Sequence, residues 1–272
     1  MILADSVTTL PATARGSVLL SGSHGGSYAA YLAVRAGVRA LILNDAGVGR
    51  DGAGIGGLAL LDTIGMAAAT ISYRSARIGD AADGRQRGII SHVNQHATSL
   101  GVTTGMQAAA ALALMHERAV PPISSLEVQT EHRFELPGEP GGPRIVVVDS
   151  AALVDLADTG QLVVTGSHGG LIGCQPERAL KAAALAALFN DAGVGIDKAG
   201  IGRLAALDTR GMAAATVSTE SARIGDARST LEDGIISHVN ETAHLCGGKV
   251  GMTARDFLRA VAASATGTGS RS

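Results

Sequence analysis

NDAGVGRDGAGIGGLALLDTIGMAAATISYRSARIGDA, residues 44–81, occurs almost unchanged a second time in this chain. Residues 190–227 read NDAGVGIDKAGIGRLAALDTRGMAAATVSTESARIGDA, and the two stretches differ at eight of 38 positions without a gap. Most of the differences exchange residues of surface type, whereas the Asn, Asp, Ser and Arg residues of the motifs stay the same. Self-similarity of this length is the signature of an internal repeat, so the sequence predicts a tandem duplication.

The repeat extends beyond this stretch in both directions. Residues 2–26 align with residues 146–170, and after a two-residue change in length the alignment continues to Gly105-Met106 and Gly251-Met252. Each copy is therefore somewhat over 100 residues long. We expect a first α/β repeat over residues 1–115, a linker with a β-hairpin arm over 116–145, a second α/β repeat over 146–264 and a disordered tail over 265–272.

Composition narrows the class of protein. The chain has 272 residues, 46% of them hydrophobic but only 2% aromatic, with 37 glycines and a net charge of -2. A core of small aliphatic residues with many glycines suits close helix–sheet packing, and the absence of a basic surplus argues against nucleic-acid binding. We expect no signal peptide and no membrane helix. The two cysteines, Cys174 and Cys246, are expected to be reduced thiols in a cytoplasmic protein.

Short apolar runs alternate with helix-like stretches in each copy. Continuous apolar runs of this length are typical of parallel strands that helices cover on both faces. We therefore predict four βα units per copy, a Rossmann-like or flavodoxin-like (βα)4 unit, with the two copies related by pseudo-twofold symmetry. A last helix is expected over residues 88–100, and residues 126–136 alternate like an antiparallel strand before a turn-rich segment, 137–142. This hairpin would join the copies or reach a neighbouring subunit.

The strand prediction places the repeated polar motifs at one edge. In open parallel sheets, ligands bind beyond the carboxyl ends of the strands. The motifs Asp-Ser, Ser-His-Gly-Gly, Asn-Asp-Ala-Gly and Ser-Ala-Arg all follow predicted strands, in both copies. We therefore expect them to converge at that edge. Whether the copies form two sites or share one stays open at this point.

The motif GSHGG puts a histidine between glycines directly after a strand. His24 and His168 are candidate general acids or bases, since imidazole titrates near neutral pH. The flanking residues are candidate substrate contacts whose backbone N–H groups suit an oxyanion; they are Ser23, Gly25, Gly26, Ser167, Gly169 and Gly170. The alternative is a tight strand–helix turn in which the histidine packs locally.

The motif Asn-Asp-Ala-Gly supplies Asn44 and Asp45, repeated as Asn190 and Asp191. The asparagines are candidate substrate contacts and the aspartates would orient the histidines. The motif lacks the Lys-Ser/Thr of a phosphate-binding P-loop. The alternative for either residue is an Asx turn or a helix N-cap.

The motif Ser-Ala-Arg holds a repeated cation, Arg77 and Arg223, that suits a two-pronged contact to a carboxylate or phosphate. The alternative is a salt bridge to an aspartate three residues on, Asp80 or Asp226. Ser75 and Ser221 are candidate nucleophiles or hydrogen-bond donors. Ser75, His24 and Asp45 together have the composition of a catalytic triad, although no nucleophile-elbow motif accompanies them.

A metal ion has weaker support. His24, Asp45 and Asp5 are suitable ligand types at neighbouring strand ends, but no clustered Cys/His spacing is present. His92 and His96 lie four residues apart, and the second copy has Thr242 in place of His96. No cofactor is therefore expected.

The leading hypothesis is a cofactor-independent hydrolase for a small anionic or amide-containing metabolite. In this hypothesis the histidines transfer protons, the arginines bind a substrate anion and the serines attack or donate. One alternative is a metabolite-binding or regulatory protein without catalysis. Another is a structural subunit of an oligomer whose repeated motifs are turns. A small-molecule substrate and a homo-oligomeric assembly are the expected partners, with neither nucleic acid nor membrane.

Overall fold

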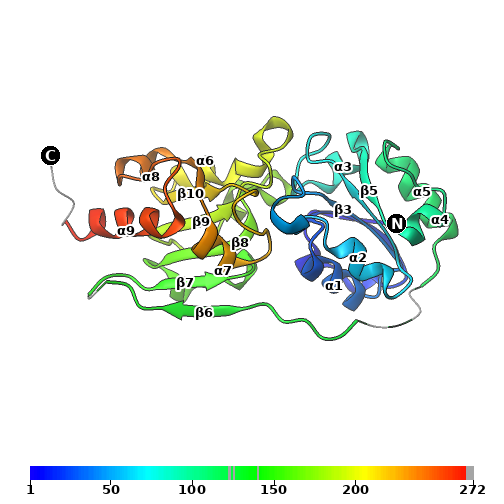
Figure 1. Cartoon of the computed structure of the whole chain (residues 1–272), viewed down its shortest axis with the longest axis horizontal. Helices are drawn as coiled ribbons and strands as arrows, with labels where there is room; N and C mark the ends of the chain where they lie inside the picture. Colours follow the sequence, from blue (N-terminus) through cyan, green and yellow to red (C-terminus); the bar gives the residue numbers. More distant parts are fainter. Residues whose placement is uncertain (122–123, 125, 140, 268–272) are drawn as a thin grey trace. The chain divides into compact units, whose positions relative to one another are not determined.

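The structure is a computed structural model that describes residues 1–121, 124, 126–139 and 141–267 (Figure 1). The chain forms two compact units. Unit 1 comprises Met1–Thr130, Gly170–Cys174 and Ala192–Gly200, and unit 2 comprises Glu131–Gly169, Gln175–Asp191 and Ile201–Ser272. Two short segments of the second sequence copy therefore belong to unit 1.

Unit 1 is built on a five-stranded sheet in the order β1-β2-β3-β4-β5. The first four strands are parallel, and β5 is antiparallel to β4. The strands are β1 (Ile2–Ala4), β2 (Val18–His24), β3 (Ala40–Asn44), β4 (Ala67–Ile71) and β5 (Ile90–Val93).

Helices cover both faces of this sheet because its strands are apolar on both sides. Leu19 packs into one buried cluster with α1 and α2, and the next residue, Leu20, packs into another with α3, α4 and α5. The helices are α1 (Ser27–Arg35), α2 (Gly57–Asp62), α3 (Ala81–Arg87), α4 (Gln95–Ser99) and α5 (Ala108–Arg118), with 3₁₀ turns η1 (Val7–Thr9), η2 (Ala12–Ala14) and η3 (Arg50–Gly52). The clusters consist largely of Ala, Val, Leu and Ile.

Unit 2 contains a six-stranded sheet in the order β11-β10-β9-β8-β7-β6. Strands β7 to β10 are parallel, and the two outer strands are antiparallel to their neighbours. The strands are β6 (Arg133–Leu136), β7 (Ile145–Val148), β8 (Leu162–His168), β9 (Ala186–Asn190), β10 (Ala213–Val217) and β11 (Ile236–Val239). Helices α7 (Ala227–Asp233), α8 (Glu241–Leu245) and α9 (Ala254–Ala265) share one core cluster with this sheet. The remaining elements of unit 2 are α6 (Gly202–Asp208), η4 (Ala151–Leu153), η5 (Leu156–Asp158) and η7 (Pro176–Arg178). Two further 3₁₀ turns of the second sequence copy, η6 (Ile172–Cys174) and all but the last residue of η8 (Ile196–Ile201), belong to unit 1.

The expected α/β class with mostly parallel sheets is confirmed. The Rossmann-like or flavodoxin-like strand order is wrong, because β1 to β4 and β7 to β10 neighbour each other in sequence order. The chain therefore never reverses direction across the sheet, as it does at the switch point of a doubly wound fold. Four βα units per copy is also too many. The first strand of each copy leads into 3₁₀ turns and not into an α-helix. The second strand of the second copy is followed by the 3₁₀ turns η6 and η7. An α-helix is disfavoured there because Gly173 and Cys174 have left-handed φ values and Pro176 lacks a backbone N–H.

The predicted helix over residues 88–100 is wrong. Residues 90–93 form the antiparallel strand β5, and only residues 95–99 are helical. Ile89 and Val93 lie four apart, a spacing that also places two side chains on the same face of a strand. Asn94 separates the two elements, because its side-chain oxygen accepts the N–H groups of Ala97 and Ala68 at 2.9 Å each.

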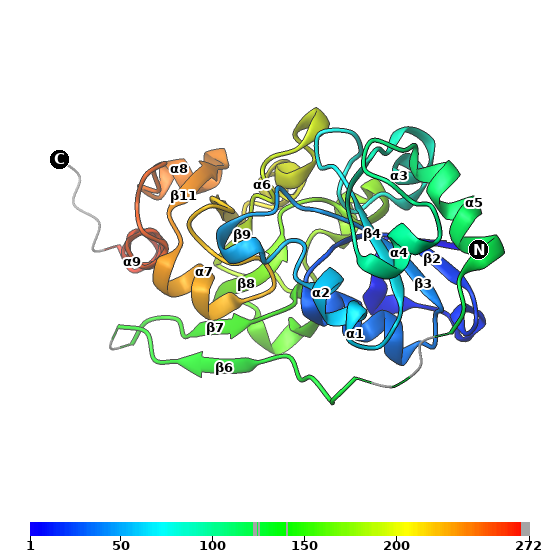
Figure 2. The same cartoon turned by 45° about the vertical axis from the view of Figure 1, so that its right-hand side comes forward.

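In the linker, β6 pairs antiparallel with β7 over four residue pairs from Arg133↔Val148 to Leu136↔Ile145 (Figure 2). Residues 126–132, the first part of the predicted strand, are not in a strand. Residue 140 of the predicted turn and residues 268–272 of the predicted tail lie outside the described residues. Among the described helices, none is both long and apolar enough to cross a membrane.

Candidate functional site

The motifs lie where the parallel strands end. In unit 1, His24 at the end of β2 is in register with Asn44 at the end of β3, and Asn44 is in register with Ile71 at the end of β4. The same register joins His168 to Asn190 in unit 2. Each unit thus presents its loops at the carboxyl edge of its sheet, and the contacts of each side chain decide its chemistry.

The GSHGG loop of unit 1 is tightly bonded to itself and to β3. The Gly25 N–H donates to the Asn44 carbonyl at 2.7 Å, and the Gly26 N–H donates to His24 Nδ1 at 3.2 Å. A Cβ at Gly26 would lie 2.7 Å from that nitrogen, so any larger residue there would displace the imidazole. Both amides are therefore engaged, which removes them from the predicted oxyanion-binding role. The Ser23 hydroxyl accepts the Val7 N–H at 3.0 Å.

The His24 imidazole is partly buried, and burial lowers its pKa from 6.5 to about 4. It is therefore neutral at pH 7. Since Nδ1 accepts a backbone N–H, the proton of the neutral ring sits on Nε2. A neutral ring with a depressed pKa is a weak base near neutral pH, and it acts better as a hydrogen-bond donor.

The equivalent loop of unit 2 follows a similar plan. The Ser167 hydroxyl accepts the Ala151 N–H at 2.9 Å, and the Gly169 N–H donates to the Asn190 carbonyl at 2.7 Å. His168 is buried, with 5% of its surface exposed. Gly170 follows it as the first residue of a short segment that belongs to unit 1.

Asn44 and Asp45 hold loops together. Asn44 donates to the Ala76 carbonyl at 3.3 Å, and its side-chain oxygen accepts the Ala46 N–H at 2.9 Å. Asp45 accepts the N–H groups of Gly47 at 3.2 Å and Tyr73 at 2.9 Å. Both side chains are nearly fully buried. Their hydrogen bonds form Asx turns and bridges between the third and fourth loops of the edge.

The second copy repeats these bridges. Asn190 donates to the Ala222 carbonyl at 3.0 Å, and Asp191 accepts the Thr219 N–H at 3.0 Å. These buried groups therefore tie the Asn-Asp-Ala-Gly loop to the Ser-Ala-Arg loop in both units.

The Ser75 hydroxyl is used at both ends. It donates to the Ser72 carbonyl at 2.8 Å and accepts the Ile89 N–H at 2.9 Å. Ser221 makes the same pair of bonds, to the Ser218 carbonyl at 2.8 Å and from the Ile235 N–H at 3.0 Å. Within the described part of unit 1, Ser75, His24 and Asp45 bond to backbone groups and not to one another, so the structure does not assemble the triad of that composition.

Arg77 does not pair with Asp80 as the simplest alternative expects. Its guanidinium lies 2.8 Å from an oxygen of Asp197 and 3.7 Å from one of Asp83. Asp80 instead caps helix α3. Arg223 does pair with its near neighbour, Asp226, at 3.2 Å.

A polar cluster lies on β4 and β5. Its residues are not among the site residues that the sequence predicts. Thr70 Oγ1 lies 3.0 Å from Ser91 Oγ, and Ser91 Oγ lies 3.2 Å from His92 Nδ1. Thr70 is fully buried, whereas Ser91 and His92 are partly exposed. A Cβ at Gly25 would meet the Thr70 methyl at 2.8 Å, so the GSHGG loop packs directly on this cluster.

A β-bulge creates the cluster. Thr70 pairs with His92 but the next residue, Ile71, pairs with Ile90, which leaves Ser91 as an extra residue in β5. Bulges of this kind redirect side chains and are common beside active sites. Because neighbouring strand residues normally face opposite sides, the bulge is what lets Ser91 contact both partners.

Unit 2 has the same cluster and the same bulge. Thr216 Oγ1 lies 3.0 Å from Ser237 Oγ, which lies 3.2 Å from His238 Nδ1. The signal for it in the sequence is the identical tetrapeptide Ser-His-Val-Asn in both copies, whose first occurrence falls within the predicted helix over residues 88–100.

The candidate metal ligands serve other purposes. Asp5 accepts the Ala81 N–H at 2.9 Å, and Asp45 accepts backbone amides as described. Within the described ranges, no group of three or more His, Cys, Asp or Glu side chains is placed to hold a metal ion.

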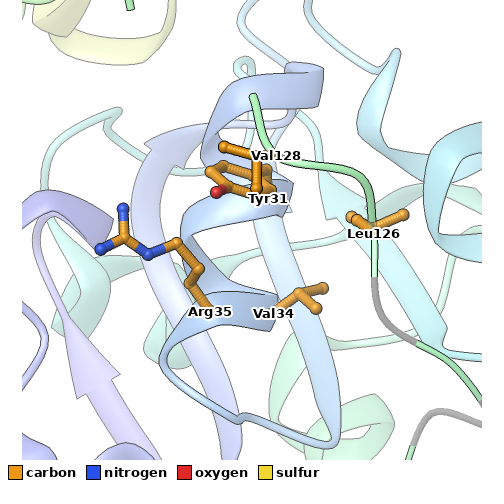
Figure 3. Close-up of a pocket in the computed structure, with 5 residues that line it drawn as sticks. All are labelled: Tyr31, Val34, Arg35, Leu126 and Val128. Carbon is orange, nitrogen blue, oxygen red and sulfur yellow. The ribbon is translucent and has the colours of Figure 1, made fainter. Parts of the chain in front are cut away.

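A groove of about 500 Å³ lies elsewhere in unit 1 (Figure 3). It runs over α1, where Val128 approaches the Tyr31 ring and Arg35 points away from both. Val34 and Arg35 lie at the C-terminal end of α1, the opposite end of the helix from the loop that follows β2. The groove is therefore distinct from the loops at the carboxyl edge.

No family model, curated protein or solved structure matches the chain.

Proposed function

We propose that the chain is a cofactor-independent hydrolase that acts on a small anionic or amide-containing metabolite at the carboxyl edge of its parallel strands. The observation that supports it most is the Ser91–His92 pair beside Thr70, repeated as Ser237–His238. A serine hydroxyl within hydrogen-bond distance of an imidazole nitrogen is the arrangement that nucleophilic catalysis needs. The hydroxyls of Ser91 and Ser237 also donate to a backbone carbonyl, that of Thr70 at 3.3 Å and that of Thr216 at 3.2 Å. Ser75 and Ser221 are less suited to this role because each donates to a carbonyl at the shorter distance of 2.8 Å and also accepts a backbone N–H.

The proposed reaction balances its protons within this pair. Ser91 Oγ bonds to the carbonyl carbon of the substrate while its proton passes to His92 Nδ1. The leaving amine or alcohol then takes that proton, which leaves an acyl-serine. Water attacks the acyl carbon and gives a proton to His92, and Ser91 Oγ recovers it on release of the acid. Thr70 positions the serine, and the Nε2–H of neutral His24 is a candidate donor to the substrate oxygen.

We infer a tandem duplication with pseudo-twofold symmetry from the near-identical sequences, the matching strand registers and the matching bulges. It implies two equivalent serine centres rather than one. A homo-oligomeric assembly and a cytoplasmic location stay predictions.

The main alternative is a metabolite-binding protein without catalysis. It is favoured by one observation, that the Asn-Asp and Ser-Ala-Arg motifs bond mainly to backbone groups. Under this alternative the repeated motifs shape a rigid binding edge, and the Ser–His pairs only contact the ligand.

A fluorophosphonate reagent tests the proposal without knowledge of the substrate. We expect phosphonylation at Ser91 and Ser237, located by peptide mass spectrometry, and none at Ser75 or Ser221. Replacement of both His92 and His238 by Gln should slow labelling at least tenfold, provided that the variant folds. Hydrolysis of p-nitrophenyl acetate should disappear in the Ser91→Ala/Ser237→Ala double variant. No labelling of either serine would overturn the proposal, and saturable metabolite binding in that case would support the non-catalytic alternative.

A further inference from the structure

Two guanidinium groups of unit 1 converge on a single carboxylate oxygen. Arg77 and Arg87 each place a terminal nitrogen 2.8 Å from the same oxygen of Asp197. The three side chains are 33% to 45% exposed, so the meeting point is open to solvent. Arginine pairs at an accessible point are suited to carboxylate and phosphate groups.

Asp83 lies behind the two arginines and orders them. It is 10% exposed, lies 2.7 Å from Arg87 Nε, and accepts the Arg77 backbone N–H at 2.8 Å. With Asp83 and Asp197 both ionised, the two positive charges are balanced. If Asp197 leaves, one positive charge remains on an ordered arginine pair, which is the condition for binding an external anion.

Asp197 reaches this point on a loop from the second sequence copy. The Ile196 N–H donates to the Tyr73 carbonyl at 2.9 Å, and a Cβ at Gly193 would meet the Tyr73 ring at 2.8 Å. Asp197 and Lys198 both have left-handed φ values, 55° and 56°. Such values cost energy in residues other than glycine, so the loop conformation that delivers the carboxylate is strained.

Three of the residues involved differ in the second copy. The alignment places Asp233 opposite Arg87, Ser229 opposite Asp83 and Thr219 opposite Tyr73. Arg223, the counterpart of Arg77, lies 3.2 Å from Asp226. One member of the arginine pair, Arg87, thus lies at a position where the two copies differ.

We propose that Arg77 and Arg87 form a binding site for a small carboxylate or phosphate, and that Asp197 is its internal, displaceable ligand. An external anion competes with Asp197 for the two guanidiniums and releases the loop of residues 192–200. Anion binding at this site does not depend on hydrolase activity, and the test below measures binding alone. If the hydrolase proposal also holds, this site would recognise an anionic end of the substrate or an anionic regulator.

Calorimetric titration with inorganic phosphate at low ionic strength tests the site. We expect Asp197→Asn to bind phosphate at least tenfold more tightly than the wild type, because the internal competitor has lost its charge. Asp51→Asn is the matched control: it removes the same charge at the equivalent loop position, and we expect less than a twofold change. Adding Arg87→Gln to Asp197→Asn should abolish the gain. Acetate in place of phosphate shows whether the site prefers a carboxylate.

Equal phosphate affinity in the wild type and Asp197→Asn would overturn the proposal. An equal gain in Asp51→Asn would also overturn it, because net charge alone would then explain the binding. A second measurement uses the wild type, in case the variant does not fold. Phosphate should slow phenylglyoxal modification of Arg77 and Arg87 relative to the exposed Arg259, and equal slowing at all three would contradict a specific site.

Discussion

The hydroxyl of Ser75 accepts the backbone N–H of Ile89 at 2.9 Å and donates to the Ser72 carbonyl at 2.8 Å. One side chain thus ties the loop after β4 to the start of β5, the strand that carries Ser91 and His92. We expect Ser75→Ala to lower the free energy of unfolding by about 1–3 kcal/mol, because an amide loses its partner. Urea unfolding followed by circular dichroism measures this.

The control for that variant is Ser99→Ala at the exposed end of α4, where the hydroxyl only donates to the His96 carbonyl. Its effect should stay within about 0.5 kcal/mol. Fluorophosphonate labelling of Ser91 should persist in folded Ser75→Ala. A loss of labelling with unchanged stability would instead make Ser75 part of the reactive centre.

Lys198 and Gly52 occupy equivalent positions in the two copies and share a left-handed backbone, with φ of 56° and 68°. A left-handed conformation costs a non-glycine residue about 1–2 kcal/mol, partly offset by the greater freedom of glycine in the unfolded chain. We expect Lys198→Gly to raise the free energy of unfolding by about 0.5–1 kcal/mol.

Gly52→Ala makes the reciprocal change and should lower stability by a similar amount. A Cβ at Gly52 has no atom within 4 Å, so the effect would report backbone strain and not a clash. Thermal denaturation of the two variants measures both signs. Two changes of the same sign would show that backbone strain does not control this position.

The sequence predicts the position of the site better than its chemistry. The repeat and the apolar runs place His24 and Asn44 at strand ends. This placement can be predicted because it depends only on the residues that neighbour them in the sequence. The roles of Asn44 and Ser75 depend on which backbone groups lie opposite, and those come from loops about 14 to 32 residues away. Local sequence does not specify such partners. The sequence pattern therefore predicts catalytic or substrate-binding roles for polar loop residues whose side chains bond to the backbone in the structure.

The Ser91–His92 contact and the Arg77–Asp197 ion pair could not be predicted from the sequence, for physical reasons. The Ser91–His92 contact needs an extra residue in β5, and the spacing of Ile89 and Val93 suits a strand and a helix equally. The pairing of Arg77 with Asp197 joins residues 120 positions apart through a loop that belongs to unit 1. The asymmetry between Arg87 and Asp233 was visible in the alignment, but its meaning required the position of Asp197.

The depressed pKa of His24 makes stability depend on pH. Burial lowers this pKa from 6.5 to about 4, so between these values the unfolded chain binds a proton that the folded protein does not. The free energy of unfolding is therefore unaffected by protonation of this histidine above pH 6.5. It falls as the pH is lowered towards 4, by up to about 3 kcal/mol at 1.36 kcal/mol per pKa unit.

His24→Asn tests this, because the Asn side-chain oxygen can still accept the Gly26 N–H without titrating. The difference in free energy of unfolding between wild type and variant should shift in favour of the variant as the pH falls from 6.5 to 4. A pH-independent difference would show that His24 is protonated in the folded protein as readily as in the unfolded chain.

Arg133 on β6 holds Asp158 in a two-pronged ion pair, with distances of 2.8 and 3.1 Å. Asp158 is 1% exposed and also accepts the Asp155 N–H at 2.9 Å. The pair joins the outer strand of unit 2 to the turn η5. Arg133 is 30% exposed and lies 3.5 Å from Glu135, so its charge stays compensated when Asp158 is neutralised. We therefore expect Asp158→Asn to cost about 1–3 kcal/mol, through the loss of charge-assisted hydrogen bonds to a buried carboxylate, and to speed hydrogen exchange of the β7 amides.

The same pair sets a lower pH limit for unit 2. The hydrogen bonds from Arg133 hold the pKa of Asp158 below its usual range. Its stabilisation is therefore present above the unfolded pKa and is lost as the pH falls through the depressed value. Asp158→Asn should abolish that part of the acid sensitivity, whereas Asp155→Asn, an exposed cap in the same turn, should change stability by less than about 0.5 kcal/mol. Equal effects of the two substitutions would assign the stabilisation to the turn itself and leave β6 without an electrostatic anchor.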